Sequence, residues 1–344
     1  MPLVLLLLST QDTAQSLIIA RKTLTLIDQL HQVRVTYIQS FNMSSNPGKL
    51  DIAAIRRRIT DLRSQYAAFG TLSHSQWNED FAQQEIDLKR FRADSAYLWQ
   101  HRDGNDAAKY LLTYFYWKSS PHKDLLQLCC EDESFGASGI HVDGTFATRD
   151  RLDSVAEIGF LRDALPSLID SEDLRILDIG AGYGRLGWRL HQCLPKAQIT
   201  LVDAIPESTA ISEAYLTSRN VSDRVRVVPL PQIEQQLAHN PPQVALAVNS
   251  LSECTAPTND WWLGLLAKYN VPNLVVVPHA LFDQGRELYS REIVMDDRVS
   301  LVPILRKHGY MRSLMAPKYA DEAVQQRGVS PTYFHLFTRE GAAQ

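Results

Sequence analysis

Between residues 174 and 278, short apolar runs alternate with longer amphipathic stretches. The runs have the length of buried strands, and the stretches between them repeat their apolar residues at helical spacing. We expect strands at 174–179, 198–203, 225–228, 244–249 and 274–278, and helices at 205–220, 233–239 and 260–269. This alternation indicates parallel strands joined by crossovers, with helices on both faces of one sheet.

The chain on either side of this region departs from the alternation. Residues 148–165 are predicted to form a helix that leads to Pro166. Residues 299–309 are also predicted to be helical. Two further strands are expected at 310–316 and 332–338, with residues 317–331 between them.

In residues 12–118, apolar side chains recur every three or four residues, as they do along one face of a helix. One long amphipathic helix is expected at 17–41, and a second begins with Asp51 as its cap and runs to about Phe69. Two more helices are expected at 76–100 and 105–118, whereas residues 119–146 are irregular. We predict an all-helical N-terminal domain at residues 1–120, a linker or lid at 121–150 and a second domain at 151–344. The N-terminal helices are candidates for shaping a substrate pocket or for a homodimer contact.

Composition narrows the class of protein. With 45% hydrophobic and 22% charged residues, the chain has the composition of an ordinary globular protein. Its net charge of −4 provides no excess of basic residues that would indicate binding to nucleic acid. The apolar run Leu3–Leu8 is far too short to span a bilayer, and no other segment is long enough. Four cysteines without ligand spacing predict reduced thiols, and we expect a cytoplasmic protein without a membrane partner.

The glycine-rich turn after the first strand can be aligned in two registers. Gly182-x-Gly184-x-x-Gly187, with Asp203 further along, fits the dinucleotide fingerprint. The competing register, Asp178-x-Gly180-x-Gly182-x-Gly184, places a carboxylate beside the glycines, where it would repel a pyrophosphate. S-adenosylmethionine has no phosphate and carries a cationic sulfonium, so the charge favours the second register. Arg185 is the nearby residue that would suit a phosphate, and it keeps the dinucleotide alternative open.

Several segments resemble known methyltransferases. Residues 176–184, Ile-Leu-Asp-Ile-Gly-Ala-Gly-Tyr-Gly, resemble motif I of the class I S-adenosylmethionine-dependent methyltransferases, and Leu201-Val202-Asp203 resembles the end of their second strand. Three shorter segments are similar to the family of sugar O-methyltransferases: Gly-Tyr-Gly-Arg-Leu at 182–186, Asn-Ser-Leu-Ser-Glu at 249–253 and Tyr-Phe-His-Leu-Phe at 333–337. The class-level resemblance implies a Rossmann-like α/β fold, with a doubly wound, mostly parallel seven-stranded sheet and an antiparallel C-terminal strand pair. It also implies S-adenosyl-L-methionine as the cofactor.

Ligands of open parallel sheets bind beyond the carboxyl ends of the strands, and five strand ends supply candidates here. A carboxylate at Asp203 can accept hydrogen bonds from both ribose hydroxyls, or it can cap the helix that follows. By resemblance, the third strand end flanks adenine, and Asn249 and Ser250 at the fourth lie near the transferring methyl. The predicted cofactor-binding residues are Asp178, Gly180, Ala181, Gly182, Gly184, Asp203, Ala204, Pro229, Leu230, Asn249 and Ser250.

The fourth and fifth strand ends also supply the candidates for catalysis. Methyl transfer to oxygen is an in-line displacement, so the enzyme aligns the reactants and removes a proton. His279 is the leading candidate for the general base, and Glu253 is the second. Ser250 or Ser252 could instead cap a helix that has Glu253 in its first turn. The predicted substrate-binding residues are Tyr183, Arg185 and Ser252.

The predicted reaction is methyl transfer from S-adenosylmethionine to a hydroxyl of a sugar or glycosylated small molecule. A metal site is not predicted, because Asp283, Asp296 and Asp297 show no spacing that argues for a cluster. Three alternatives remain: a methyltransferase for another natural product, an NAD-dependent oxidoreductase, and a non-catalytic partner subunit with the same fold.

Overall fold

The structure is a computed structural model of the chain. It describes residues 50–67, 86–94, 97, 106–279, 291–295, 298–339 and 341, together with the backbone of three short strands at 36–38, 282–283 and 286–287. The carboxylates of Asp283, Asp296 and Asp297, which were considered as metal ligands, lie outside the described side chains.

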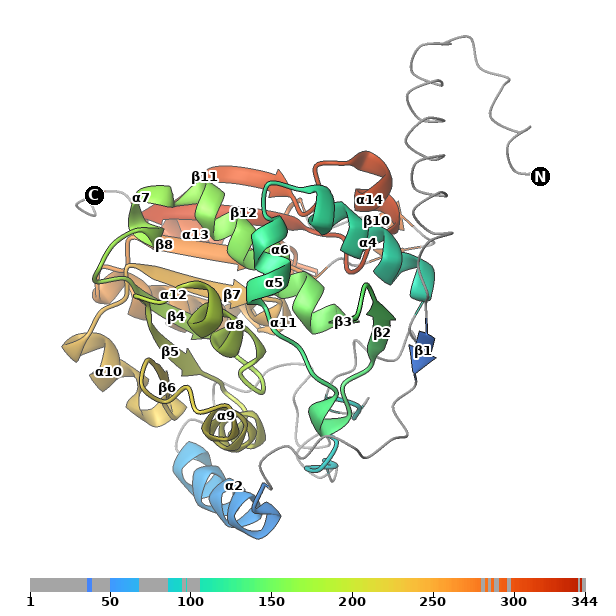
Figure 1. The fold of residues 1–344 in the computed structure, drawn as a ribbon. Coiled ribbons are helices and arrows are strands. Elements are labelled where there is room, and N and C mark those ends of the chain that lie inside the picture. The colour runs from blue at the N-terminus through green and yellow to red at the C-terminus, as the bar shows by residue number, and fades with distance from the viewer. Residues whose placement is uncertain are drawn as a thin grey trace.

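A central sheet of seven strands organises the fold (Figure 1). Its order is β11-β12-β8-β7-β4-β5-β6. The strands are β4 (Arg175–Ile179), β5 (Gln198–Val202), β6 (Val225–Val227), β7 (Val244–Val248), β8 (Asn273–Val277), β11 (Tyr310–Pro317) and β12 (Tyr333–Arg339). The first five run parallel, whereas β12 pairs antiparallel with both β8 and β11. The predicted fold class, including the antiparallel C-terminal pair, is confirmed.

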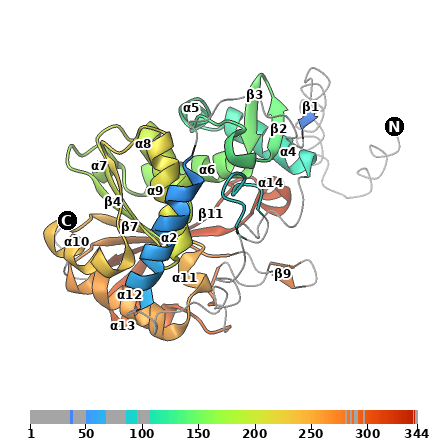
Figure 2. The ribbon, with the colours of Figure 1, turned by 90° about the horizontal axis from the view of Figure 1, so that it is seen from below.

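Helices cover both faces of this sheet, as Figure 2 shows. On one side lie α8 and α9, and on the other lie α10, α12 and α13. The main helices are α6 (Arg149–Ala164), α7 (Pro166–Ile169), α8 (Arg185–Cys193), α9 (Pro206–Ser218), α10 (Ile233–His239), α11 (Ser250–Glu253), α12 (Ala256–Lys268), α13 (Val302–Lys307) and α14 (Glu322–Arg327). None of the helices in the described ranges is both long and apolar enough to cross a bilayer.

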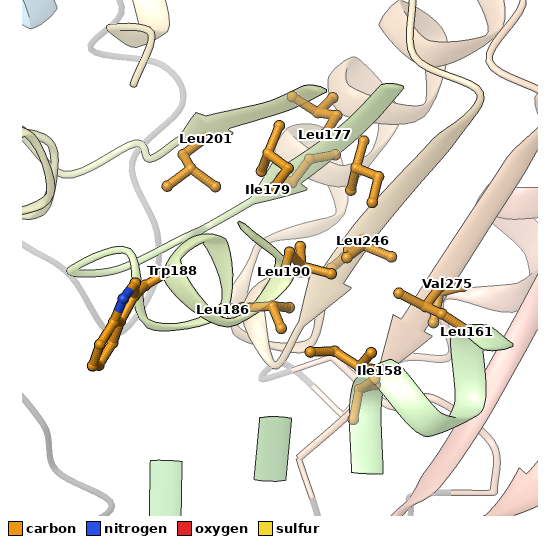
Figure 3. Packing of buried hydrophobic residues seen from close by; sticks show 14 of the residues in the cluster. Ile158, Leu161, Leu177, Ile179, Leu186, Trp188, Leu190, Leu201, Leu246 and Val275 are labelled. Atoms are coloured by element: carbon orange, nitrogen blue, oxygen red, sulfur yellow. The ribbon is translucent and has the colours of Figure 1, made fainter. Parts of the chain in front are cut away.

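The core forms where alternate residues of the strands meet the apolar stripes of the helices. Leu177 and Ile179 of β4 lie two residues apart and therefore share one face of the sheet. Leu186 and Leu190 of α8 pack near them, and Ile158 of α6 lies over the neighbouring strands (Figure 3). This packing brings the N-terminal ends of α6 and α8 close to the carboxyl ends of the strands.

Two helices of the N-terminal region pack on the same core. α2 (Ile52–Tyr66) is capped by Asp51, whose side chain accepts the amide of Ala54 at 2.9 Å, and Arg58 forms a bidentate ion pair with Glu213 of α9 at 2.8 Å. α4 (Ala107–Ser119) contacts α6 and α14. Both helices match the sequence prediction, and their buried side chains belong to the same hydrophobic core as the sheet. The proposed domain boundary at residue 120 stays a prediction.

Three local expectations were wrong, and the rest of the expected helix at 17–41 lies outside the described residues. Residues 36–38 form a strand, β1 (Thr36–Ile38), because they pair antiparallel with β2 (Gly139–Val142). Residues 86–94 form turns instead of part of a helix. The segment predicted as an irregular linker contains α5 (Lys123–Leu128) and a hairpin of β2 and β3 (Thr145–Thr148).

Candidate functional site

The strand order reverses between β4 and β7, and a cavity lies at their carboxyl ends. From β4 the chain continues outward to β5 and β6, whereas β7 leads outward to β8, so the crossovers leave a crevice between the two strands. The residues that line this cavity in the described part of the chain are Tyr97, Arg149, Asp150, Asp178, Ile179, Gly180, Ala181, Gly182, Tyr183, Arg185, Leu186, Asp203, Ala204, Ile205, Ser208, Val248, Asn249, Ser250, Glu253, Cys254 and Trp262. The structure thus brings together most of the predicted site residues.

Glycine is required at two positions of the turn for different reasons. Gly180 has φ +74°, and a Cβ there would lie 2.3 Å from the Cβ of Ser250. Ser250 cannot withdraw easily, because its hydroxyl donates to the carbonyl of Ile179 at 2.6 Å. Gly182 has φ +57°, and a Cβ there would meet nothing within 4 Å. The backbone at Gly182 therefore borders open space, so a ligand can approach it closely.

The amides of the turn are already engaged within the protein. Gly180 and Ala181 both donate to the carbonyl of Val202, at 2.9 and 3.2 Å, and Gly182 donates to the carboxylate of Asp203 at 2.8 Å. A pyrophosphate-binding turn instead presents its amides to the ligand. The turn is therefore poorly suited to a dinucleotide.

Arg185, the residue that kept the dinucleotide alternative open, is also engaged. Its guanidinium forms two hydrogen bonds with the carboxylate of Glu157 on α6, at 2.7 and 2.9 Å, and donates to Ser154 at 2.9 Å. Glu157 is buried, so this bidentate pair is shielded from water and its charges cancel locally. Arg185 therefore does not supply a cation for a phosphate, and its predicted contact with the substrate stays a prediction.

Two buried carboxyls face the cavity. Burial raises the pKa of Asp178 to about 7, which Arg185 partly opposes. Burial likewise raises the pKa of Asp203 to about 7, although the amides of Ile205 and Gly182 donate to its carboxylate. The bond from Ile205 is 2.8 Å long. Ile205 is the N-cap of α9 and no side chain caps that helix, so Asp203 orders the approach to α9 but does not have the capping role that was its alternative interpretation. With Asp150 and Glu253, four carboxyl groups from the described part of the chain line the cavity.

The fourth and fifth strand ends are held together by side chains. Asn249 has φ +65°, and its backbone N–H donates to the carbonyl of Val277 at 2.7 Å. The hydroxyl of Ser252 donates to the carbonyl of Asn249 at 2.6 Å and accepts the amide of His279 at 3.2 Å. The imidazole Nε2 of His279 lies within hydrogen-bonding distance of Glu253, and both side chains are largely buried. The two candidate bases, weighed as alternatives from the sequence, therefore contact each other.

Tyr183 and Asp150 form the wall of the cavity beside the glycine turn. The phenol of Tyr183 donates to the carboxylate of Asp150, and the ring packs on that of Phe91 at 5.3 Å between centroids. Asp150 also accepts from Arg92 at 3.4 Å, which in turn donates to the buried Glu131 at 2.9 Å. Tyr183 is therefore fixed by a buried network, and its contact with substrate stays a prediction.

Five other predicted residues do not belong to the lining that the structure describes. Gly184 begins α8, where a Cβ would lie 2.7 Å from the hydroxyl of Ser212, and Ser252 and His279 lie behind Glu253. Pro229 and Leu230 follow β6, and the amide of Leu230 donates to the hydroxyl of Tyr66 on α2 at 2.8 Å. The backbone donor expected for adenine therefore contacts the N-terminal region, and the adenine role of this segment stays a prediction.

Comparison with known proteins assigns the domain that holds this cavity. Residues 140–243 match the family model of the methyltransferase small domain. This segment extends from β2 through the glycine turn to the start of β7, within a sheet of methyltransferase topology. The chain has the fold of the class I S-adenosylmethionine-dependent methyltransferases, a fold that binds S-adenosylmethionine. No curated protein matches the sequence.

The methyltransferase domain also resembles solved structures at low identity. Magnesium protoporphyrin IX methyltransferase from Synechocystis PCC 6803, with bound S-adenosylhomocysteine, is 10% identical over 67% of this chain and 100% of that chain, with a TM-score of 0.40. A methyltransferase from Aquifex aeolicus is 11% identical over 56% and 98%, with a TM-score of 0.37. The cyclase SpnF is 17% identical over 68% and 97%, with a TM-score of 0.40. Similarity of this degree says nothing about the substrate.

The raised pKa values of Asp178 and Asp203 predict that cofactor binding to the methyltransferase domain depends on pH. A cationic sulfonium and ribose hydroxyl donors both favour ionised carboxylates, so binding should lower these pKa values and release protons near pH 7. Affinity should fall as the pH drops from 8 to about 6. Without cofactor the sign is opposite: ionisation of the buried acids destabilises the fold as the pH rises from about 4 to about 7. Calorimetry in buffers of different ionisation enthalpy measures the released protons, and an affinity that is constant from pH 6 to 8 would contradict the prediction.

Sequence reasoning missed several residues of the cavity wall. Tyr97 and Ser208 are joined by a hydrogen bond of 3.2 Å, and Trp262 comes from α12. Arg149 and Asp150 were not missed, because the resemblance to class I methyltransferases implies that the helix at 148–165 packs beside the cofactor with residues 148–151 at the pocket, and both line the cavity. Nothing in the sequence distinguishes Tyr97 or Trp262 from core aromatic residues.

Proposed function

We propose that the methyltransferase domain transfers a methyl group from S-adenosylmethionine to a hydroxyl of a sugar or glycosylated small molecule. The observation that carries the proposal is a cavity rich in carboxyl groups that ends at a buried pair of candidate bases, Glu253 and His279. A hydroxyl acceptor must lose a proton as it attacks, and a carboxylate–imidazole pair is suited to accept it. Hydroxyl groups are also the donors that carboxylates such as Asp150 and Glu253 bind well.

The residues at the cavity fit the cofactor chemically. Asp203 would accept the ribose hydroxyls, the open space at Gly182 admits close approach, and the carboxyl of Asp178 would compensate positive charge. When bound, S-adenosylmethionine supplies an electrophilic methyl group on its sulfonium. Asn249 and Ser250 stand at the adjoining strand end, where the resemblance places the methionine part.

Glu253 and His279 would act as one base. Glu253 lines the cavity, and its carboxylate contacts Nε2 of His279 behind it. A proton taken from the acceptor by Glu253 can therefore be shared with the imidazole without crossing open solvent. Because the two side chains contact each other, we expect either residue alone to support only slow proton removal.

Ligand-dependent thermal stability tests the proposed cofactor against the alternatives. A ligand that binds the folded state alone raises the unfolding temperature. S-adenosylhomocysteine at concentrations on the order of hundreds of micromolar should stabilise the chain, and NAD should not. Stabilisation by NAD alone would favour the oxidoreductase. A product mass gain of one methylene across a panel of glycosylated metabolites then tests the acceptor class, and separates this enzyme from a non-catalytic subunit and from a methyltransferase for other products.

Arg149 is the residue we propose for the carboxylate of the cofactor. It lines the cavity. Its Nε contacts the hydroxyl of Ser330 at 2.9 Å and the carboxylate of Asp153 at 3.2 Å, and these two contacts occupy one edge of the guanidinium group. Asp153 is paired in addition with the buried Lys318, so this corner has two cations for one carboxylate. A ligand carboxylate would compensate the surplus positive charge.

Truncated ligands can test the role of Arg149. Arg149→Gln should weaken binding of S-adenosylhomocysteine about tenfold or more, because a charged hydrogen bond is lost. The same substitution should leave the affinity for methylthioadenosine unchanged, since that ligand has no carboxylate. Arg312→Gln, at an exposed residue of β11, is the control and should change neither affinity. If Arg149→Gln weakens both ligands equally, Arg149 supports the cavity and does not bind the carboxylate.

A further inference from the structure

Two cysteines that are far apart in the sequence meet in the core. Cys129 directly follows α5, and Cys193 is the last residue of α8. Their Sγ atoms are 3.4 Å apart, and both residues are buried. The two other cysteines have different surroundings: Cys130 is exposed, whereas Cys254 is buried at the cofactor cavity.

The local charges favour a thiolate at this contact. The pKa of Cys129 is lowered, mainly because the thiol of Cys193 donates to its sulfur. Burial opposes this effect, whereas the guanidinium groups of Arg189 and Arg151 add to it. The pKa of Cys193 is correspondingly raised, so when the pair loses one proton the negative charge is favoured on Cys129 and the remaining proton on Cys193.

A route to the outside exists on the side of Cys193. This residue lines a surface depression of about 360 Å³ between α7 and the turn that follows α8. The depression is also lined by Arg162, Pro166, Ile169, Asp170, Leu194, Pro195 and Lys196. A small oxidant in this depression therefore reaches Cys193 before it reaches Cys129, which is completely buried.

We propose that Cys129 and Cys193 are an oxidisable pair that closes to a disulfide when the protein meets a peroxide. In the singly ionised pair, Cys193 attacks a peroxide oxygen while its proton passes to the Cys129 thiolate. The O–O bond breaks to leave a sulfenic acid on Cys193 and a hydroxide, which takes a proton from solvent and becomes water. The sulfur of Cys129 then attacks the sulfenic sulfur and expels hydroxide, which takes up the remaining thiol proton as water. One thiol, one thiolate, one hydrogen peroxide and one proton from solvent give one disulfide and two waters, so each sulfur is oxidised by one electron.

The disulfide fits the fold with little movement. An S–S bond is about 2.05 Å long, so the two sulfur atoms need to approach by about 1.4 Å. The bond would connect α5 to α8, the helix that follows the glycine turn, and restrict the unfolded chain across the segment between the two cysteines. We expect the oxidised protein to resist urea to a higher concentration than the reduced protein, and to keep its affinity for S-adenosylhomocysteine within about twofold.

Peptide mapping of the full chain tests the proposal directly. After treatment with hydrogen peroxide and alkylation under denaturing conditions, two of the four thiols should be protected, and the intact mass should be lower by two hydrogen atoms before alkylation. A cross-linked peptide should contain Cys129 and Cys193, and a reductant should release it. Four alkylated thiols, oxidation that stops at a sulfinic acid, or a link from Cys129 to Cys130 would overturn the proposal.

Single substitutions provide the matched controls. Cys193→Ala should abolish the cross-link, whereas Cys130→Ser, at the neighbouring exposed cysteine, should leave it intact. Loss of the cross-link in Cys130→Ser would point to thiol exchange through the exposed residue and would contradict direct closure. The mapping of the unaltered chain remains decisive if a core variant fails to fold, and neither result depends on the identity of the methyl acceptor.

Discussion

Replacing Asp203 by alanine is expected to weaken binding of S-adenosylhomocysteine by about a hundredfold or more. The carboxylate stands at the end of β5 inside the cavity, where it can accept both ribose hydroxyls. It also accepts the amides of Gly182 and Ile205, each at 2.8 Å, so it holds the glycine turn in place. The substitution therefore removes contacts with the ligand and support for the backbone that surrounds it. Isothermal titration calorimetry at pH 8, where the carboxyl is ionised, measures the loss.

His279→Ala is the matched control for this experiment. His279 lies at the end of β8, behind Glu253, and is not part of the described cavity lining. Its removal should change the affinity for S-adenosylhomocysteine by less than about threefold while it slows methyl transfer by about a hundredfold or more. A thermal melt of each variant without ligand shows whether the fold persists. Equal losses of affinity in the two variants would contradict the assignment of Asp203 to the cofactor and His279 to the base.

The glycine turn shows how far local sequence can predict a site. Asp178, Gly180 and Gly182 are separated by single residues at the end of an apolar strand, so their proximity follows from the chain itself. The structure adds a reason that sequence reasoning lacked: the amide of Gly180 donates to the carbonyl of Val202, and the amide of Gly182 donates to the carboxylate of Asp203. From the sequence, the carboxylate of Asp178 favoured the glycine register typical of S-adenosylmethionine sites over the dinucleotide register. The amides that are already hydrogen-bonded within the protein support the same register on independent grounds.

Residues from remote parts of the chain could not be predicted in this way. The hydroxyl of Tyr66 accepts the amide of Leu230, which is 164 residues away, and no local pattern indicates that pairing. Residues 36–38 have helical spacing, but pairing with β2 overrides their local preference. Glu253 and His279 were each identified from a strand end, yet their contact follows only from the parallel pairing of β7 with β8.

A buried charge network supports the wall of the cavity and explains the cost of disturbing it. The side chain of Glu131 is completely buried, and its Oε2 accepts from Arg92 at 2.9 Å and from Arg189 at 2.8 Å. The hydroxyl of Thr148 donates to the same oxygen. Burial would raise the pKa of Glu131, but the two guanidinium groups outweigh it and hold the pKa below its ordinary value. The carboxylate therefore stays ionised and balances two cations that water does not reach.

Glu131→Ala should lower the free energy of unfolding by about 3–5 kcal/mol, because it leaves Arg92 and Arg189 buried without their shared counter-charge. Urea unfolding at pH 7 measures this loss. Glu172→Ala is the control: this residue pairs with Lys196 at the surface, its side chain is 82% exposed, and its loss should change stability by less than about 0.5 kcal/mol.

The pH dependence of the stability loss in Glu131→Ala separates the contribution of charge from that of packing. A depressed pKa contributes stability above pH 4.5 that is lost as the pH falls through the folded-state value, so the gap between wild type and Glu131→Ala should narrow in acid. A gap that stays constant down to pH 3 would mean that the lost packing, and not the charge, accounts for the destabilisation.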